Sequence, residues 1–535
     1  MNYTKIIFFL CFCVIFTHCA KRGFPEGGPK DESPPVLVNA NPKENSINFD
    51  EKRIRLFFDE YIKLEDFRKQ LVVSPPIEKS LYSISPQSGA SKYIQIDIND
   101  TLPRQQTYVF NFGQSVIDNN EGNVLPFFKY VFSTGNYIDS LKISGNIKNS
   151  FKREDEKFIS ILLYPFDENF SDSIIYNSIP TYVGSTLDST YFEISNLKKG
   201  KYLLIGLNDS NNDYKFNPDF EEIGFMKNFI EIPYDKEINL EIFKEEIIFK
   251  SFKPFIQSNN NIAFGFKGKY QDVKIELIDS FQSPFKSILT KSKETDTLNY
   301  WFSNIKYDSL RFVVKSKTKN ELHTVYFKEK EKDSLIITSS NNGSIDLNET
   351  FKLFSNIPIQ KIENNQISIL NKDSISIPFE TKIDENNFDV VFNFELLPND
   401  DYKLLLLPNA LKDFLGSVND TLSYDLSTKS RSDYGLLKLA IQNQKSYPII
   451  VQLTDFEGKV VREKILKSNL DACIFENLNP AQYYLKIIFD ENNNEKWDTG
   501  NFLNKVFPEK IYHYDEKIII RANWILEEKI ILEDE

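Results

Sequence analysis

Two short segments of the chain place oxygen-bearing side chains at alternate positions, a spacing that could hold a metal ion. The first begins at Asp209 and the second at Asp490. Calcium takes roughly six to eight hard oxygen ligands, and Asp and Asn side chains that alternate along a tight loop can converge on one point. The pattern therefore predicts two calcium loops. The candidate ligands are Asp209, Asn211, Asp213 and the Lys215 backbone in the first loop, and Asp490, Asn492, Asn494, the Lys496 backbone and Asp498 in the second.

Neither segment matches an EF-hand in full. An EF-hand has Gly at its sixth position, where Tyr214 and Glu495 stand, and Glu at its twelfth, where Phe220 and Asn501 stand. In the first loop, the adjacent pair 221–222 offers substitute carboxylates. The alternative is that both segments are Asx turns, because Asp and Asn side chains accept hydrogen bonds from backbone N–H groups two residues on. Both interpretations stay open on the sequence, and calcium is the one cofactor suggested.

The rest of the sequence offers little to a catalytic reaction. After residue 18 the only histidines are His323 and His513, in unrelated strand-like contexts, so a histidine triad or zinc site lacks residues. No Gly-rich phosphate loop and no Gly-x-Ser-x-Gly elbow occurs. The net charge of −13 is spread along the chain, whereas nucleic-acid phosphates need clustered Lys and Arg. We therefore expect no enzyme activity and no nucleic-acid partner.

An apolar run near the N-terminus predicts export. Lys5 precedes the run 6–16, which is too short to span a membrane and is typical of a signal peptide. The run is followed by Cys19, and this arrangement resembles a bacterial lipoprotein processing site, with departures at Phe16 and His18. The alternative is an ordinary signal peptide that contains a Cys.

The lipoprotein resemblance implies a signal peptide over 1–18 and a lipid on Cys19, which would become the mature N-terminus. The segment 19–34 is rich in Gly, Pro and charge, so we expect a tether that buries no core. The single later thiol, Cys473, lies in a strand-like run and is predicted to be a small buried hydrophobe.

From residue 35 onward, short runs with β-type residues alternate with turns rich in Asn, Asp, Gly and Ser. The run 93–98, for example, alternates with period two, as half-buried strands do. Capped segments with helical periodicity are missing. Strands at regular short spacing favour β-sandwiches, so the predicted fold class is all-β, with about five modules in a row.

An internal duplication divides these modules. A constant offset of 281 maps Asn196-Leu197, Tyr202 and the first acidic loop onto Asn477-Leu478, Tyr483 and the second. A weaker echo precedes each copy, with Tyr108 and Asp118 mirrored by Tyr402 and Asp413. We predict two copies of a module pair flanking an unpaired sandwich. The predicted domains are 35–136, 137–250, 251–339, 340–430 and 431–535.

Several of these motifs resemble known families. The motifs Phe57-Phe58-Asp59-Glu60, Thr107-Tyr108-Val109-Phe110 and Phe132-Ser133-Thr134-Gly135 look like the bacterial Ig-like domain of the S-layer SbsA type. With Cys19 and the tether, the chain resembles an Ig-like-domain lipoprotein of the Bacteroidota. The segment 340–430 is then a degenerate Ig-like domain. The segments 137–250 and 431–535 are similar to transthyretin-like or carboxypeptidase-regulatory-like sandwiches, although Ala481 replaces the Gly found at 200.

These resemblances imply a structural or protein-interaction function in the cell envelope, with other envelope proteins as partners. The lipid would attach the chain to the outer membrane. Ala20-Lys21-Arg22 after Cys19 favours the periplasmic face over the cell surface, where the Bacteroidota place acidic residues. A carbohydrate-binding surface lipoprotein is the alternative. Its sugar platform would be Tyr300-Trp301-Phe302 or Trp497, although core packing is the more frequent use of Trp497 and Phe216.

Overall fold

A computed structural model describes most of the chain from residue 30 onward. The described residues are 30–154, 156–281, 285–303, 307–317, 319–330, 334–384, 389–443 and 447–532. The predicted signal peptide, Cys19 and most of the predicted tether lie outside them. Within the described residues the only α-helices are two single turns, α2 (Phe67–Gln70) and α3 (Ile174–Asn177), and apart from three short 3-10 turns the rest of the regular structure is strands. The all-β prediction is confirmed.

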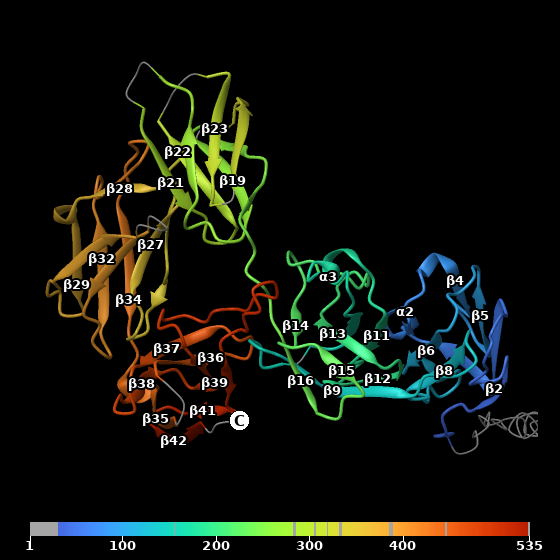
Figure 1. Cartoon of the computed structure of the whole chain (residues 1–535). Coiled ribbons are helices and arrows are strands. Elements are labelled where there is room, and N and C mark those ends of the chain that lie inside the picture. The colour runs from blue at the N-terminus through green and yellow to red at the C-terminus, as the bar shows by residue number, and fades with distance from the viewer. Residues whose placement is uncertain are drawn as a thin grey trace, which may run out of the picture.

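Two sheets that face each other form the first unit, which we call module 1 (Figure 1). Alternate residues of its long strands point inward. This buries Ile54, Leu56 and Phe58 on one sheet, and Phe110 and Phe132 on the other. The strands of the first sheet are β1 (Leu37–Asn41), β2 (Arg53–Leu64), β5 (Ser91–Ile98) and β4 (Tyr82–Ser85), with β7 (Val116–Asp118) on β2; those of the second are β3 (Val72–Ser74), β6 (Thr107–Gly113) and β8 (Phe128–Ser133).

Module 2 is also a sandwich, but one of its sheets is buried on both faces. Along β10, Ile161 and Leu163 pack into the sandwich, while Leu162 and Tyr164 pack into a second apolar cluster outside it. The strands of the doubly buried sheet are β11 (Tyr182–Ser185), β10 (Ser160–Pro165), β13 (Gly200–Leu207), β14 (Ile223–Phe225) and β15 (Ile230–Ile232); those of the other sheet are β12 (Tyr191–Leu197), β9 (Leu141–Asn149) and β16 (Ile238–Ile242).

Modules 3 and 4 continue the chain as two further sandwiches. Module 3 contains β17 (Lys250–Ser251), β18 (Phe255–Ser258), β19 (Asn261–Lys267), β20 (Lys274–Leu277), β21 (Ser287–Lys291), β22 (Thr297–Phe302), β23 (Ser309–Lys315) and β24 (Asn320–Tyr326). Module 4 contains β25 (Ile337–Ser339), β26 (Gly343–Ser344), β27 (Phe351–Ser355), β28 (Ile359–Ile362), β29 (Ile367–Asn371), β30 (Phe379–Ile383), β31 (Val390–Phe394), β32 (Asp401–Leu406), β33 (Leu411–Asp413) and β34 (Leu422–Ser427).

Module 5 repeats the strand order of module 2. Its sheets run β38-β35-β42 and β37-β36-β39-β40, with β41 on β39, as those of module 2 run β12-β9-β16 and β11-β10-β13-β14, with β15 on β13. The strands are β35 (Gly435–Asn443), β36 (Ile449–Thr454), β37 (Val460–Leu466), β38 (Cys473–Leu478), β39 (Ala481–Phe489), β40 (Ile511–His513), β41 (Ile518–Ile520) and β42 (Ile525–Leu532).

The residues that revealed the duplication have the same local functions in both copies. Asn196 and Asn477 adopt left-handed φ values of 62° and 49°, which Asn tolerates better than most residues. The Tyr202 hydroxyl donates to the Lys198 carbonyl, as that of Tyr483 does to Asn479. Each motif therefore fixes the turn between two strands.

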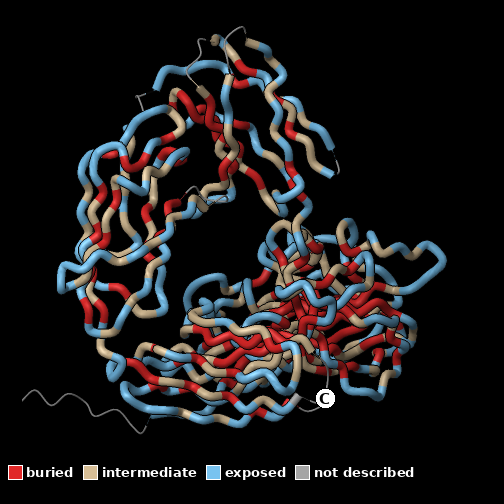
Figure 2. The backbone as a smooth tube through the Cα atoms, turned by 90° about the vertical axis from the view of Figure 1, so that its left-hand side faces the viewer, coloured by how far each residue is buried: buried red, intermediate tan, exposed pale blue. Residues whose placement is uncertain are grey.

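The modules follow one another in sequence but are not arranged as an extended rod. Module 5 returns to module 2, so that modules 2 to 5 form a closed ring from which module 1 projects (Figures 1 and 2). At the closing contact, Phe502 of module 5 is fully buried in the outer cluster of module 2. The row of sandwich modules along the sequence is therefore as expected, while the closing contact joins residues far apart in the sequence.

Candidate functional site

The first acidic loop connects β13 to β14 and is held by its own hydrogen bonds. The two carboxylate oxygens of Asp209 accept the backbone N–H groups of Asp213 and Tyr214 at 3.2 and 2.9 Å. Asn211 accepts the N–H of Asp213, and Asp213 accepts that of Lys215. These are the Asx turns that the sequence left as the alternative to calcium.

The second loop, between β39 and β40, repeats this geometry. Asp490 accepts the N–H groups of Asn494 and Glu495 at 3.0 and 2.9 Å, and Asn494 accepts that of Lys496. Tyr214 and Glu495, which replace the EF-hand Gly, both adopt left-handed conformations, with φ of 59° and 63°. Such conformations are uncommon for residues other than Gly, so the surrounding hydrogen bonds must enforce them.

A buried glutamate closes each loop, and the second of the two is the residue that the sequence analysis missed. Glu221 accepts the N–H groups of Ser210 and Asn217, at 3.2 and 2.7 Å. Glu509 makes the equivalent bonds, accepting the N–H groups of Glu491 and Asp498. The offset between the copies is 281 at Asn217 but 288 at Glu221, so a repeat search that allowed a gap would have found Glu509.

Burial dominates the electrostatics of these carboxyl groups. It raises the pKa of Asp209, Glu221 and Glu509 above their ordinary values, although backbone hydrogen bonds act in the opposite direction. A buried carboxylate is stable only when its oxygens are hydrogen-bonded. The loops satisfy this requirement with backbone N–H groups.

The described residues supply an incomplete ligand set for calcium. No three His, Cys, Asp or Glu side chains in the described parts of the chain gather closely enough to hold a metal ion. In the second loop, the amide nitrogens of Asn492 and Asn494 both donate to Asp498, so a cation would have to displace two hydrogen bonds. Calcium binding therefore stays a prediction, and the geometry favours turns.

A calorimetric titration with calcium chloride tests that prediction on the full chain. Heat that saturates at about two ions and disappears in Asp209→Asn/Asp490→Asn would support calcium loops, because these residues begin both ligand sets. No heat in the unaltered protein would leave the loops as hydrogen-bonded turns.

We expect Glu221→Gln to lower the free energy of unfolding of module 2 by about 1–3 kcal/mol, with or without calcium. A Gln amide would present its NH₂ group to a backbone N–H that now donates to the carboxylate. Chemical denaturation followed by hydrogen exchange in β13 measures the change. Glu231→Gln, an exposed position on β15, is the matched control and should have no effect. Equal effects of both variants would contradict this assignment.

The predicted sugar platform in module 3 is wrong. Tyr300, Trp301 and Phe302 on β22 are at most 6% exposed, because side chains on both faces of this strand are covered. The Trp301 indole N–H donates to the Thr290 hydroxyl at 3.2 Å. These aromatic residues stabilise the sandwich and cannot stack on a ligand.

We expect Trp301→Phe to cost about 1–2 kcal/mol of stability through the lost hydrogen bond and lost volume. Thermal unfolding of the variant measures this cost. A glycan array should give the same result for the variant and the unaltered protein. Glycan binding lost without any loss of stability would contradict the assignment of Trp301 to the core.

Neighbouring side chains partly or fully cover four other residues considered from the sequence. Phe216 is buried in the outer cluster of module 2, as predicted. Trp497 is half-buried and lies 4.7 Å from the Phe151 ring of module 2, so it packs between modules. Cys473 is a buried free thiol with a pKa raised to about 12 by burial, which confirms that it serves as a hydrophobe. His513 is isolated in β40, and burial lowers its pKa to about 4.

Comparisons with solved structures find matches at low similarity. The surface layer protein SbsC, domains 1–6, is 11% identical with a TM-score of 0.14, over 91% of this chain and 67% of that chain. BcpA, the major pilin subunit of Bacillus cereus, is 10% identical with a TM-score of 0.14, over 73% of this chain and 99% of that one. A Bacteroides ovatus protein, SGBP-B of a mixed-linkage glucan utilization locus, is 10% identical with a TM-score of 0.18, over 71% and 94%.

These values are too low to support any statement about function. The comparison with curated proteins found no match. A family model described as bacterial Ig-like domain matches residues 31–134, which contain all the strands of module 1. Module 1 is therefore a bacterial Ig-like domain.

Proposed function

We propose that this protein is a non-catalytic scaffold of the bacterial cell envelope that presents its ring of sandwiches to other envelope proteins. The observation that carries the proposal is the closing contact between modules 2 and 5. Flexibly linked modules move relative to one another by default, whereas a large apolar contact fixes them. A closed ring therefore offers partners one preformed surface.

The closing contact has apolar, polar and charged components. The Phe502 ring lies 5.3 Å from Phe225 of module 2, and its backbone N–H donates to Glu245, a buried carboxylate, at 2.5 Å. Lys505 pairs with Asp172 at 2.8 Å. Aromatic side chains seated in a pocket beside satisfied polar groups are typical of stable interfaces.

Two further joints of the ring are held by hydrogen bonds or an ion pair. Modules 3 and 4 are joined by the Lys293–Asp389 ion pair at 2.5 Å. Modules 4 and 5 meet at Asp346, whose carboxylate accepts from Tyr434 and Asn479. Burial acts to raise the pKa of Asp346, but these bonds and Lys429 outweigh it and lower the pKa. Each joint thus restricts movement of its neighbours.

Attachment through Cys19 to the outer membrane, with the periplasmic face favoured, is part of the proposal. No helix in the described residues is long and apolar enough to cross a membrane. A lipid on Cys19 would attach the chain on the module 1 side, because module 1 is the first module after the tether. The ring would then lie beyond module 1, available to partners.

Cell fractionation combined with protease treatment of intact cells tests the location. We expect the tagged protein in the outer membrane and protected from external protease, and Cys19→Ser in the soluble fraction. Crosslinking in the same cells should recover other envelope proteins. Recovery of none would contradict the scaffold proposal, and digestion from outside would contradict the periplasmic face.

Carbohydrate binding is the second candidate, at a different place from the one predicted. On the outer face of module 1, the rings of Phe57 and Tyr93 lie 5.7 Å apart, and the Arg55 guanidinium lies 5.9 Å from the Tyr93 ring. Tyr93 is 40% exposed. Exposed aromatic rings on a flat sheet can stack on sugars. Glycan-array binding that is lost in Tyr93→Ala would favour this candidate over the scaffold.

A further inference from the structure

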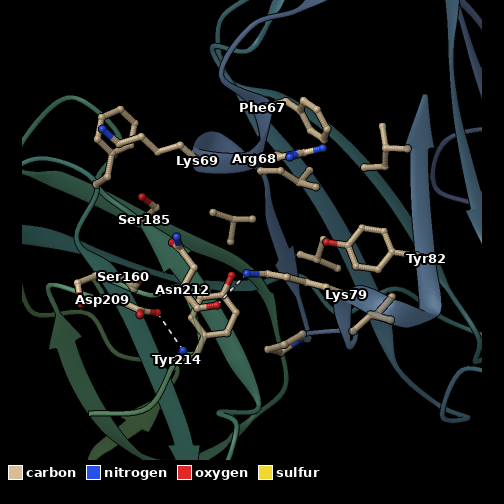
Figure 3. A pocket seen from close by; sticks show the side chains of 18 of the residues that line it. Phe67, Arg68, Lys69, Lys79, Tyr82, Ser160, Ser185, Asp209, Asn212 and Tyr214 are labelled. Atoms are coloured by element: carbon tan, nitrogen blue, oxygen red, sulfur yellow. Dashed lines mark hydrogen bonds between the residues drawn. The ribbon is translucent and has the colours of Figure 1, made fainter. Parts of the chain in front are cut away.

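A cleft of about 790 Å³ lies between modules 1 and 2 (Figure 3). Its module 1 wall is formed by α2 and the segment between β3 and β4, and its module 2 wall by β10, β11 and the first acidic loop. Small-molecule sites are typically about 300–1,000 Å³ and are frequent between domains. The cleft therefore has the size of a ligand site.

Direct bonds between the two modules hold the walls of the cleft in place. The Val183 N–H of module 2 donates to the Ser74 hydroxyl of module 1 at 3.1 Å. The Thr107 hydroxyl donates to Asp139, a buried carboxylate, at 2.8 Å. Val72 of module 1 belongs to the outer apolar cluster of module 2. A ligand would thus meet a preformed cleft and would not have to order it.

The lining of the cleft is cationic, in contrast to the acidic chain as a whole. Four cations line it, Arg68, Lys69, Lys79 and Lys157, against one carboxylate, Asp209. Both oxygens of Asp209 already accept backbone N–H groups. Module 1 contributes three of the cations and module 2 contributes Lys157, so positive charge lies on both walls of the cleft.

These cations have no carboxylate partners among the residues that the structure describes. The nearby carboxylate of Glu156 pairs instead with Lys152, at 2.5 Å. Lys79 donates to the Asn212 carbonyl across the cleft at 2.8 Å, as Figure 3 shows. Lys69 lies 4.1 Å from the centre of the Phe158 ring. Their positive charges are therefore available to a ligand.

Apolar and hydroxyl groups complete the lining. Phe67, Ile77 and Phe158 contribute apolar surface, and Tyr82 points into the same space in Figure 3. A simple inorganic ion would leave this apolar surface in water. A ligand with an apolar body and anionic groups would contact both kinds of lining.

We propose that the cleft between modules 1 and 2 binds a small organic anion with an apolar body, carrying carboxylate or phosphate groups. Arg68 and Lys157 hold the anionic groups from opposite walls, because guanidinium and ammonium groups form charge-assisted hydrogen bonds with such oxygens. Phe67 and Phe158 contact the body. The site does not depend on the scaffold proposal, since modules 1 and 2 form it without modules 3 to 5.

Calorimetric titration of the full-length protein with naphthalene-1,5-disulfonate, a flat dianion, tests the proposal. We expect saturable binding at one site, and an affinity at least about tenfold lower in Arg68→Ala/Lys157→Ala, since each charge-assisted bond contributes strongly. Arg104→Ala/Lys199→Ala removes the same charges from exposed positions of the same modules and should bind normally. Uncharged 1,5-dihydroxynaphthalene should not bind.

Competition experiments distinguish a carboxylate ligand from a phosphate ligand, and the control variants show whether the proposal fails. Citrate competing better than inorganic phosphate would assign a carboxylate ligand, and the reverse would assign a phosphate. Because all four substituted residues are exposed, thermal unfolding should show both double variants folded. Binding that is absent, or equal in the two double variants, would overturn the proposal. Phe158→Ala provides a second check, since it should weaken the disulfonate but not inorganic phosphate.

Discussion

Replacing Phe502 with Ala should separate module 5 from module 2 and open the ring, at a cost of about 3–5 kcal/mol in the contact. The side chain is fully buried in an apolar cluster to which module 2 contributes nearly every other member. Its removal leaves a cavity beside Phe225. It also removes the packing that holds the backbone N–H of residue 502 in place to donate to Glu245. Module 5 should stay folded, because its own core does not include Phe502.

Small-angle X-ray scattering measures this opening as an increase in the maximum dimension of the particle. Phe456→Ala is the matched control, since this Phe of module 5 is 78% exposed. An unchanged scattering curve for Phe502→Ala would show that the ring does not depend on this contact. A loss of β-structure in module 5 would contradict the assignment of Phe502 to the joint.

Replacing Asp118 with Ala should destabilise module 1 by about 3–5 kcal/mol. This carboxylate is 1% exposed and accepts the N–H groups of Asn120, Glu121, Gly122 and Asn123, at 2.6 to 3.2 Å. Alanine would leave the N–H groups of the whole turn without an acceptor. Hydrogen exchange of the β6 amides measures the change.

Module 4, the predicted second copy of module 1, offers a matched control. Asp413 is equally buried, but its Oδ1 accepts one backbone N–H, that of Ser417, at 2.7 Å, and its Oδ2 has no hydrogen-bond partner in the described structure. Asp413→Ala should therefore lower the stability of module 4 by less than Asp118→Ala lowers the stability of module 1. The opposite order would contradict this account of the turn.

The contribution of Asp118 should also depend on pH. Burial acts to raise its pKa, but the backbone hydrogen bonds outweigh burial and lower the pKa below the ordinary 3.8. Because the folded-state pKa is the lower one, the stabilisation is complete above about pH 3.8 and disappears as the pH falls through the folded-state value. The difference in the free energy of unfolding between the unaltered protein and Asp118→Ala should therefore become smaller over that acid range.

Local sequence patterns predicted the strands and the duplication well. Period-two alternation predicts half-buried strands directly, and β5, which contains the whole 93–98 run, is one of them. The Asn-Leu motif and the Asp at the head of each acidic loop have the same backbone environment in both copies, which is why a constant offset found them. The weaker echo between modules 1 and 4 also corresponds in structure, since the Tyr108 and Tyr402 side chains are both buried.

The ring contact could not be predicted from such patterns. Between Asp498 and Glu509 the second copy has seven more residues than the first has between Asn217 and Glu221. This insertion contains Phe502 and Lys505, the residues that contact module 2. An insertion breaks the repeat and so carries no signal in a search for self-similarity. Its partner residues lie more than two hundred positions away.

The cleft and the buried Trp301 were unpredictable for a related reason. Arg68 and Lys157 lie in different modules, and only the docking of those modules places both at one cleft. The run Tyr300-Trp301-Phe302 looks like an exposed platform, because a sequence does not reveal when both faces of a strand are covered. Both features depend on tertiary packing.

Site-specific photo-crosslinking in cells, with and without the ring, tests the scaffold claim most directly. A photoreactive residue at Leu322, which is 76% exposed on β24, reports on partners of the ring surface. We predict that the intact protein crosslinks to the same envelope protein in repeated experiments, and that Phe502→Ala loses this crosslink while staying in the outer membrane. Crosslinks unchanged in Phe502→Ala, or no envelope protein captured by either form, would contradict the account.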